Sequence, residues 1–563
     1  MFIEPVSGSM FFGREEVLGT LQKRMTALKG GYRQNLALTG PMLSGKSSIL
    51  RHFIKNASDV DVIPIYIELD GEDFNVFAFR FMAALMYGYL VSRGKSLDAD
   101  ICPEEPSRLP GCGKKASVDF DKFRKLSREL IPDTTRCISA IMDQLEKKKI
   151  DRAYEGLLAL TSVFKAETGK SCVVILDEFH NISNFGLKRP FQVFGKFIMV
   201  QKNTMYVVSS SQETLLRDIL SSKLSLLFGN FEVIEIKGFD DHAARAFISG
   251  KIEQMDDDGE VRDYIIQLSQ GNPFYLDVMV RRMAQISSAS RGQLEKKECL
   301  IHAMAELLYS SEGVLNQYFT NTMSFFLEKK NRKKYIPVLV SMAMGNSTCK
   351  AIQKNMGKKD KDLGVKLAKL REMDIVWNSG VFYKIADKLF EYWLTHVYAV
   401  KTRSMIDDMD MKYLEFKNSA GEDYESYRMF RSVDAADLIC GILKKFNNER
   451  IEVGRNQRKL AFFREIKKPH RDGNITAITG ETGTGRWVFH IKQRDIATEQ
   501  DISDLKKLPY GSDKHKILKK ILVPLGGIDE TAFLLAKEHN VWVWDEVTLN
   551  RIFRVYGRFE LVL

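Results

Sequence analysis

The sequence predicts a multidomain α/β protein, and three observations indicate that class. The chain has 563 residues, more than one hydrophobic core usually serves. Residues 35–39 and 171–176 are apolar runs of strand length, the first followed by a glycine-rich segment and the second by two acids. Segments with helical patterns separate such runs, as in a parallel sheet covered by helices. We therefore expect three or four domains, beginning with an α/β domain.

The composition is typical of a globular chain with a moderate basic excess. Hydrophobic residues make up 44% and charged residues 28%, as in ordinary globular domains. The net charge of +11 suggests DNA or RNA as a partner, and a need for solubility explains it equally well. The N-terminal segment lacks a signal-peptide pattern and Arg80 interrupts the apolar residues 77–91, so no membrane span of about 20 residues is expected. Scattered cysteines without a CxxC pair favour a cytoplasmic location without zinc.

Residues 40–47 have the pattern G-x-x-x-x-G-K-S of the Walker A phosphate loop. A strand-like run before them and a helical segment after them supply the context that the motif requires. Glycines let the backbone wrap around a phosphate, and amide groups point at it. Lys46 is expected to reach the β- and γ-phosphates of ATP as a catalytic residue, and Ser47 to bind Mg²⁺. The expected nucleotide contacts are Gly40, Pro41, Ser44, Gly45, Lys46, Ser47 and Ser48. A chance glycine-rich turn is the alternative.

A second motif ends at Asp177 and Glu178. Apolar residues followed by two acids predict a buried parallel strand with carboxylates at its carboxyl end, where open α/β sheets bind ligands. This is the Walker B pattern of the Asp-Glu type. Asp177 is expected to hold Mg²⁺ and Glu178 to polarise the attacking water, because phosphoryl transfer depends on positioning and charge neutralisation. Two acids after a strand are weak evidence alone and strong evidence beside a phosphate loop.

The order of these motifs resembles the archaeal-type ATPases of the STAND and AAA+ groups. Residues 11–16 read FFGREE ahead of the phosphate loop, and residues 176–181 read LDEFHN. The resemblance implies a P-loop ATPase core over residues 1–240, with a parallel sheet of order 5-1-4-3-2 and an insert at 94–150. It also implies a γ-phosphate sensor at Ser209–Ser211, for which an ordinary serine-rich loop is the alternative.

The same resemblance assigns the segment after the core. Residues 241–330 correspond to a helical lid, in which Pro273 abuts the nucleotide. Relatives carry a Gly-Arg pair whose arginine can act as a finger, whereas residues 229–230 are Gly-Asn in this chain. Arg217 and Arg245 are the candidates to replace that arginine.

Residues 331–400 are expected to form a winged helix. Three helical segments precede two short strands that meet at Ser379-Gly380, and that order is typical of the fold. The stretch YKIADKLFEYWL at 383–394 resembles the end of this unit in archaeal-type ATPases. The lysines expected to face DNA phosphates are Lys359, Lys361, Lys366 and Lys369. In STAND proteins the same unit can instead pack on the ATPase as a regulatory lid.

Residues 401–411 are predicted to be a polar connector, followed by a second α/β domain at 412–563. The order of its elements resembles the restriction-endonuclease-like fold, in the Mrr or PD-(D/E)xK branch. In that fold an Asp and an (E/Q)-x-K motif bind a divalent metal and activate water. Asp472 matches the Asp as catalytic residue and metal ligand, and Lys492 matches the catalytic Lys.

His490 departs from this pattern, because it stands where relatives have Glu or Gln. Imidazole suits Mn²⁺ or other transition metals better than Mg²⁺. Gln493 and Glu481 are the nearby replacements. The module is therefore expected either to cleave DNA or to be a degenerate nuclease fold that binds DNA or a protein, and a generic α/β domain is a further alternative.

Together these assignments predict a cytoplasmic regulatory ATPase that uses ATP and Mg²⁺ and acts with DNA. A homo-oligomer or a protein partner is compatible with them, and no membrane is expected. The combination fits ATPases of prokaryotic defence or mobile elements, by resemblance only. An origin- or replicon-binding protein is a third interpretation.

Overall fold

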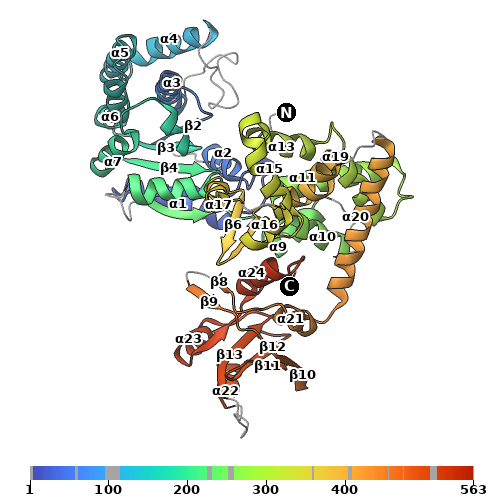
Figure 1. Cartoon of the computed structure of the whole chain (residues 1–563). Helices are drawn as coiled ribbons and strands as arrows, with labels where there is room; N and C mark the ends of the chain where they lie inside the picture. The colour runs from blue at the N-terminus through green and yellow to red at the C-terminus, as the bar shows by residue number, and fades with distance from the viewer. Residues whose placement is uncertain are drawn as a thin grey trace. The chain divides into compact units, whose positions relative to one another are not determined.

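The computed structural model describes residues 4–56, 61–94, 114–224, 231–251, 259–357, 360–403, 409–453, 456–472, 475–507 and 516–561. The chain forms two compact units, Met1–Gly238 and Phe239–Leu563 (Figure 1). Four predictions fall at least partly outside the described residues. They concern the finger position at 229–230, the proline-rich part of the insert at 95–113, Lys359, and residues 404–408 of the expected connector.

A five-stranded parallel sheet forms the centre of the first unit. Its strand order is β2-β3-β4-β1-β5, which confirms the predicted order 5-1-4-3-2. Every residue of β3 and β4 is buried, because helices cover both faces of a parallel sheet. The strands are β1 (Asn35–Thr39), β2 (Val62–Glu68), β3 (Ser171–Asp177), β4 (Thr204–Ser210) and β5 (Phe231–Glu235).

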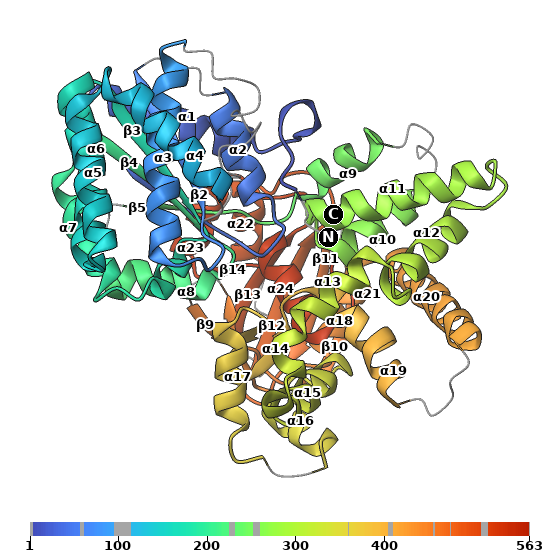
Figure 2. The same cartoon turned by 90° about the horizontal axis from the view of Figure 1, so that it is seen from above.

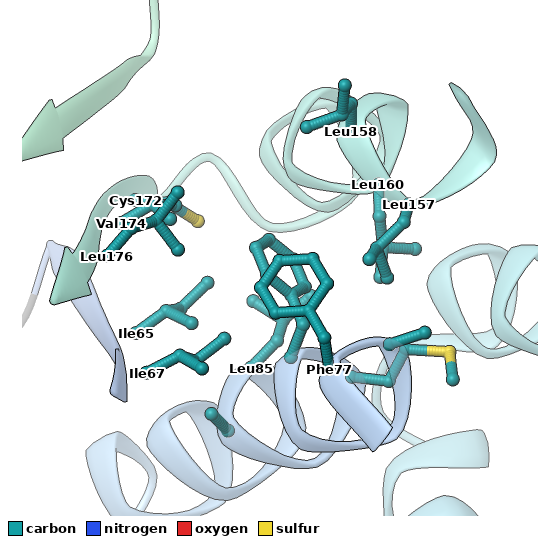
Figure 3. Packing of buried hydrophobic residues seen from close by; sticks show 14 of the residues in the cluster. Ile65, Ile67, Phe77, Leu85, Leu157, Leu158, Leu160, Cys172, Val174 and Leu176 are labelled. Atoms are coloured by element: carbon teal, nitrogen blue, oxygen red, sulfur yellow. The ribbon is translucent and has the colours of Figure 1, made fainter. Parts of the chain in front are cut away.

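One face of this sheet carries the largest hydrophobic core of the unit. Figure 3 shows Ile65 and Val174 of the sheet facing Phe77 of α3 and Leu157 of α6. Helix α3 is long and apolar enough to cross a membrane by length and composition, but its side chains form this core. The helices are α1 (Glu15–Lys29), α2 (Lys46–Asn56), α3 (Phe74–Ser92), α4 (Lys114–Arg128), α5 (Pro132–Glu146), α6 (Ile150–Thr168), α7 (Pro190–Val200) and α8 (Glu213–Asp218), with the short helices η1 (Gly8–Met10), η3 (Phe179–Asn184) and η4 (Ile219–Lys223).

The second unit begins with a group of helices. They are α9 (Asp241–Ser249), α10 (Gly259–Ser269), α11 (Pro273–Ala289), α12 (Lys296–Met304), η6 (Ala305–Tyr309), α13 (Val314–Thr322) and α14 (Ser324–Leu327). Three helices and a hairpin follow: α15 (Lys329–Ala343), α16 (Cys349–Asn355), α17 (Leu363–Glu372), β6 (Val376–Ser379) and β7 (Phe382–Ile385). The strands β6 and β7 are antiparallel, and Thr348 forms an isolated bridge with Phe382.

A long helix, α20 (Met409–Ser432), follows α18 (Lys388–Trp393), η7 (Leu394–Tyr398) and α19 (Ala399–Arg403). Figure 2 shows α20 beside α12. Its buried hydrophobic side chains are spaced four, four and three residues apart, and such a stripe faces one side of a helix. They are Phe416, Ala420, Tyr424 and Tyr427. Residues 412–432, which were expected to open the C-terminal α/β domain, therefore form a helix that packs against the preceding helices.

The C-terminal sheet has the order β10-β11-β12-β13-β14, in which β10, β11 and β12 are antiparallel neighbours and β13 and β14 continue in parallel with β12. Phe489 and Ile491 of β12 pack in one core with α21 and α24. Residues of β13 alternate between two cores, because Ile521 and Val523 belong to that core and Leu522 packs with α22 and α23. The strands are β10 (Glu465–Asp472), β11 (Ile475–Glu481), β12 (Arg486–Lys492), β13 (Ile517–Pro524) and β14 (Val541–Val543), besides the hairpin β8 (Arg450–Val453) and β9 (Asn456–Lys459). The helices are α21 (Ala435–Leu443), α22 (Glu499–Lys507), α23 (Glu530–Glu538) and α24 (Glu546–Tyr556).

Candidate functional site

The phosphate loop joins β1 to α2 and needs its glycines for steric reasons. A Cβ atom at Gly40 would overlap the carbonyl oxygen of Ile236. Gly45 has a φ of 97°, a backbone conformation that glycine adopts readily and that is strained for other residues. Pro41 is exposed and Ser47 is partly buried in the first turn of α2.

The Lys46 side chain folds into this loop. Its Nζ donates hydrogen bonds to the carbonyl oxygens of Gly40 and Pro41, each at 2.9 Å. Burial lowers the pKa of Lys46, and the charges of Glu178 and Asp177 oppose that shift. The Lys46 Nζ is therefore held inside the phosphate loop by two backbone carbonyl oxygens, a position that suits contact with a phosphate.

Two serines of the loop differ in their hydrogen bonding. The Oγ atom of Ser44 is buried and has no hydrogen-bond partner among the described residues. Ser48 Oγ accepts a hydrogen bond of 3.0 Å from the backbone N–H of Val6. A buried polar atom without a partner is costly, so Ser44 fits a loop that closes around an anion, whereas Ser48 is already engaged by the N-terminal segment.

Asp177 lies fully buried at the end of β3. Its Oδ2 accepts a hydrogen bond of 2.8 Å from the hydroxyl of Tyr66, and its Oδ1 accepts one from the hydroxyl of Ser209. Two side-chain donors from neighbouring strands therefore orient the carboxylate. Orientation of this kind is what a metal-binding carboxylate requires of the groups behind it.

Glu178 has a left-handed backbone with φ of 53°, a conformation that costs energy for a residue other than glycine. Its Oε2 accepts hydrogen bonds from the backbone N–H and the hydroxyl of Ser211, both at 2.9 Å. Burial raises the pKa of Glu178, and the charge of Asp177 raises it further, while Ser211 and Lys46 act in the opposite direction. A carboxylate with a raised pKa is suited to proton transfer near neutral pH.

The sheet brings the two motifs together. Strand β4 lies between β1 and β3, and all three run in parallel, so their carboxyl ends share one edge, where such sheets bind ligands. The electrostatic coupling of Lys46 with Glu178 and Asp177 is consistent with that arrangement. The serines Ser209 to Ser211, expected as a sensor, meet the two acids at this edge.

Three contributors to the site were not predicted from the sequence. The first is Tyr66, which only the register of β2 beside β3 places near Asp177. The second is His180, whose Nδ1 lies 2.9 Å from Ser210 Oγ and 3.4 Å from Glu178 Oε2; burial lowers the pKa of this imidazole. The LDEFHN motif contained His180, so a signal for it was present.

The third contributor is Arg14, from the FFGREE segment. Its guanidinium donates hydrogen bonds to the carbonyl oxygens of Ser44 at 3.3 Å and of Lys237 at 2.5 Å. Arg14 itself has a φ of 71°. Arg14 therefore links the segment before α1 to the phosphate loop at Ser44 and to the residue Lys237 after β5.

The two candidate replacements for an arginine finger are both paired. Arg217 donates two hydrogen bonds, of 2.9 and 2.7 Å, to Glu213, and Arg245 of the second unit pairs with the buried Asp263 at 3.1 Å. Pro273 also lies in the second unit, where it follows the N-cap Asn272 at the start of α11. Its predicted contact with the nucleotide stays a prediction.

Asp472 and Lys492 lie on one row of the C-terminal sheet. Asp472 pairs with Ile475, and Ile475 pairs with Lys492, so their backbones are roughly 9–10 Å apart. The side chain of Asp472 is outside the described residues. Lys492 Nζ contacts Asp501 Oδ2 at 2.8 Å and the Ile496 carbonyl oxygen at 3.2 Å. The expected catalytic lysine is thus engaged by an acid of α22.

The positions near Lys492 do not build a metal site from described side chains. His490 is buried, and its Nε2 has no hydrogen-bond partner among the residues that the structure describes. Burial lowers the pKa of this imidazole to about 4. Gln493 Nε2 donates to Asp434 Oδ2 at 3.1 Å, and Glu481 pairs with Arg486 at the opposite end of β11. Among the described residues, no three His, Cys, Asp or Glu side chains form a group that could hold a metal.

Proteins similar to this chain are found in one family of ATPase domains and among solved structures. No curated protein matches the sequence. Solved structures with a similar fold include the Walker-type ATPase PABY2304 of Pyrococcus abyssi, at 16% identity and a TM-score of 0.45, with 70% of this chain and 99% of that chain covered. Another is the ORC2 protein of Aeropyrum pernix in ADPNP–ADP complexes, at 10% identity and a TM-score of 0.41, with 71% and 98% covered. A third is the ORC1 protein of the same organism in complex with DNA, at 15% identity and a TM-score of 0.35, with 69% and 93% covered. Residues 11–279 match the model of a family described as an ATPase domain predominantly from Archaea, and the strand order of the parallel sheet in this part of the chain is that of a P-loop NTPase fold.

Proposed function

We propose that this chain is a regulatory ATPase of the STAND-like kind, which binds ATP with Mg²⁺ and uses hydrolysis to control a DNA-binding second unit. The observation that carries the proposal is the placement of buried Lys46, which follows β1, at the same carboxyl edge of the parallel sheet as Asp177 and Glu178, which end β3. A cation and two acids at such an edge have the charge pattern that a triphosphate and its metal need.

Each residue then has a role set by its surroundings. Lys46 contacts the β- and γ-phosphates, and the loop amides bind their oxygens. Ser47 and Asp177 hold Mg²⁺, which when bound neutralises charge on the phosphates. Glu178 orients and deprotonates the attacking water, helped by its raised pKa. Tyr66 and Ser209 keep the Asp177 carboxylate in place.

ATP binding and hydrolysis by the purified chain test this proposal. Lys46→Ala is expected to lose nucleotide binding, and Glu178→Gln to keep binding but lose hydrolysis by about 10²-fold or more. Glu155→Gln on α6, an exposed acid, is the matched control and should behave as wild type. A chain that neither binds nor hydrolyses ATP would contradict the proposal.

For the second unit we propose a helical lid over residues 241–330 and a winged helix over 331–400. Support comes from the order of α15, α16 and α17 before the β6–β7 hairpin, and from the bridge of Thr348 to Phe382, which is the topology of that fold. The net charge of +11 favours DNA as the ligand. Binding to duplex DNA that weakens steeply with salt would support this assignment.

For the C-terminal module we propose a restriction-endonuclease-like fold that binds DNA or a protein and does not cleave DNA. The order α21, β10, β11, β12, α22 and β13 supports that topology. The pairing of Lys492 with Asp501 at 2.8 Å favours a structural role for the lysine. Plasmid incubation with Mg²⁺ or Mn²⁺, comparing wild type with Lys492→Ala, is expected to show no metal-dependent nicking; nicking by wild type alone would establish the nuclease instead. A setting in prokaryotic defence or mobile elements fits this combination.

A further inference from the structure

We propose that the second unit holds duplex DNA through the first two turns of α15, where Arg332, Lys333 and Lys334 contact backbone phosphates. The β6–β7 hairpin, called the wing below, and helix α17 would then not be the main DNA contact. This inference rests on the proposed DNA-binding function and assigns the surface that performs it. Three groups of contacts within the second unit lead to it.

The wing is covered by the hairpin β8–β9. A Cβ atom at Gly380, at the turn of the wing, would overlap the carbonyl oxygen of Arg450. Next to it, the backbone N–H of Glu452 donates to Ser379 Oγ at 2.9 Å. Backbone packs directly on backbone at this point, so the turn has no room to enter a DNA groove.

Helix α24 covers the rest of the wing. The guanidinium groups of Arg551 and Arg554 lie over the Trp377 ring at 5.7 and 5.0 Å, and the Phe382 and Tyr556 rings meet edge to face at 5.1 Å. Both cations therefore contact the wing, and Arg551, whose side chain is 32% exposed, also pairs with Glu452 at 3.8 Å.

The lysines expected on α17 are largely neutralised. Lys366 pairs with Asp360 at 2.5 Å, with only 17% and 9% of the two side chains exposed, and Lys369 pairs with Glu372 at 3.1 Å. Lys361 is exposed, and Lys359 lies outside the described residues. A lysine that already has a carboxylate partner gains less from a phosphate, because one attraction replaces another.

Helix α15 has the opposite character. It begins KKNRKK, with five basic residues in six and no acidic residue in its first turn. Arg332, Lys333 and Lys334 are exposed and have no ion-pair partner in the described part of the chain, whereas Lys330 reaches Glu328 at 3.3 Å. Positive charges repel each other and the positive end of the helix, and a polyanion bound there would relieve both effects.

The neighbouring side chains favour duplex DNA over other polyanions. In this helix Val338, Leu339 and Met342 are buried, so the basic turns have no apolar stripe of the kind that enters a lipid bilayer. No exposed aromatic ring among the described residues of α15 is present to stack on unpaired bases, which is how single strands are usually held. The proposed contacts are all between basic side chains and backbone phosphates, so the binding should be independent of DNA sequence.

Salt-dependent binding of the full chain to a labelled duplex tests the assignment. In the triple variant Arg332→Gln, Lys333→Gln and Lys334→Gln, the slope of log affinity against log salt concentration should become shallower by roughly 2.7, at about 0.9 per phosphate contact. The matched control replaces Lys147, Lys148 and Lys149 by Gln, three exposed lysines in the turn between α5 and α6. This control and the double variant Lys366→Gln, Lys369→Gln should keep the wild-type slope.

The outcomes separate the two proposals. If wild type binds no duplex at low salt, both the DNA-binding function and this surface are wrong. Suppose instead that wild type binds. If the α15 variant and the control variant then change the slope equally, or if only the α17 variant changes it, the DNA-binding function stands and only the assignment to α15 is overturned. Tighter binding to single-stranded RNA or to vesicles of anionic lipid would overturn it as well. The thermal midpoint of the α15 variant should equal or exceed that of wild type, because like charges have been removed.

Discussion

The hydroxyl of Tyr66 donates a hydrogen bond of 2.8 Å to Asp177, across neighbouring strands and 111 residues of sequence. Burial raises the pKa of Tyr66 well above its ordinary value, and the charge of Asp177 adds to that shift. The tyrosine therefore keeps its proton and remains a donor at neutral pH. Asp177 is fully buried, and a buried polar group needs hydrogen-bond partners such as this hydroxyl.

We expect Tyr66→Phe to raise the Mg²⁺ concentration needed for half-maximal ATP hydrolysis by about tenfold or more. Residues that hydrogen-bond a metal ligand commonly have effects of that size. The measurement is the ATPase rate as a function of Mg²⁺ concentration. Tyr206→Phe is the matched control, since Tyr206 is buried in β4 and its hydroxyl bonds Gln201 at 2.8 Å. An unchanged Mg²⁺ dependence in Tyr66→Phe would show that the tyrosine is only structural.

Ser211→Ala is expected to shift the pH dependence of ATP hydrolysis. The hydrogen bonds from Ser211 hold down the pKa of Glu178 against burial, so loss of the hydroxyl should raise that pKa. Glu178 acts as a base only when deprotonated, and the acidic limb of the kcat/KM profile should therefore move to higher pH. Ser139→Ala is the control, because its hydroxyl bonds only the Thr135 carbonyl within α5. A shift to lower pH, or none, contradicts the assigned roles.

The phosphate loop and the acids of β3 could be predicted because each is a contiguous pattern with its chemistry in adjacent residues. The sheet order followed from the resemblance that these patterns carried. In contrast, Tyr66 and Ser209 reach Asp177 only through the register of β2 and β4 beside β3. That register depends on packing of the whole sheet, and no local spacing encodes it.

In the second unit, the limits of prediction have other causes. Lys492 was matched to a catalytic position by its place on a strand, but its partner Asp501 comes from α22, nine residues later. Helix α20 was missed although its stripe of buried residues has helical spacing. The helix begins at Met409, inside the stretch 401–411 that was predicted to be a polar connector, and the rest of it was assigned to the C-terminal α/β domain.

His490 makes the stability of the C-terminal module dependent on pH. Burial lowers its pKa from 6.5 to about 4, with Lys520 acting in the same direction and Asp501 and Asp504 against it. Below pH 6.5 the unfolded chain takes up a proton that the folded chain does not, so the free energy of unfolding falls as pH drops from 6.5 to about 4. The loss is at most roughly 3.5 kcal/mol, from about 1.4 kcal/mol per pH unit over the window from 6.5 to about 4.

Denaturant unfolding of wild type and His490→Gln at several pH values measures this loss. The difference between the two proteins should grow across the window between pH 6.5 and 4. His539→Gln, at the end of α23, is the control and should follow wild type. Parallel curves for wild type and His490→Gln would contradict a buried neutral imidazole.

Tyr427→Ala is expected to destabilise the second unit, because this residue anchors α20. Its side chain is 1% exposed, and its ring centroid lies 5.2 Å from that of Tyr264 on α10. Loss of a large buried aromatic side chain costs about 3–5 kcal/mol. Met429→Ala is the matched control on the same helix, since Met429 is 66% exposed and its loss should cost less than about 0.5 kcal/mol. Urea unfolding followed by circular dichroism measures both. If the two substitutions have equal effects, the packing of Tyr427 against Tyr264 does not hold α20 in place. Residues 412–432 would then belong with the C-terminal module.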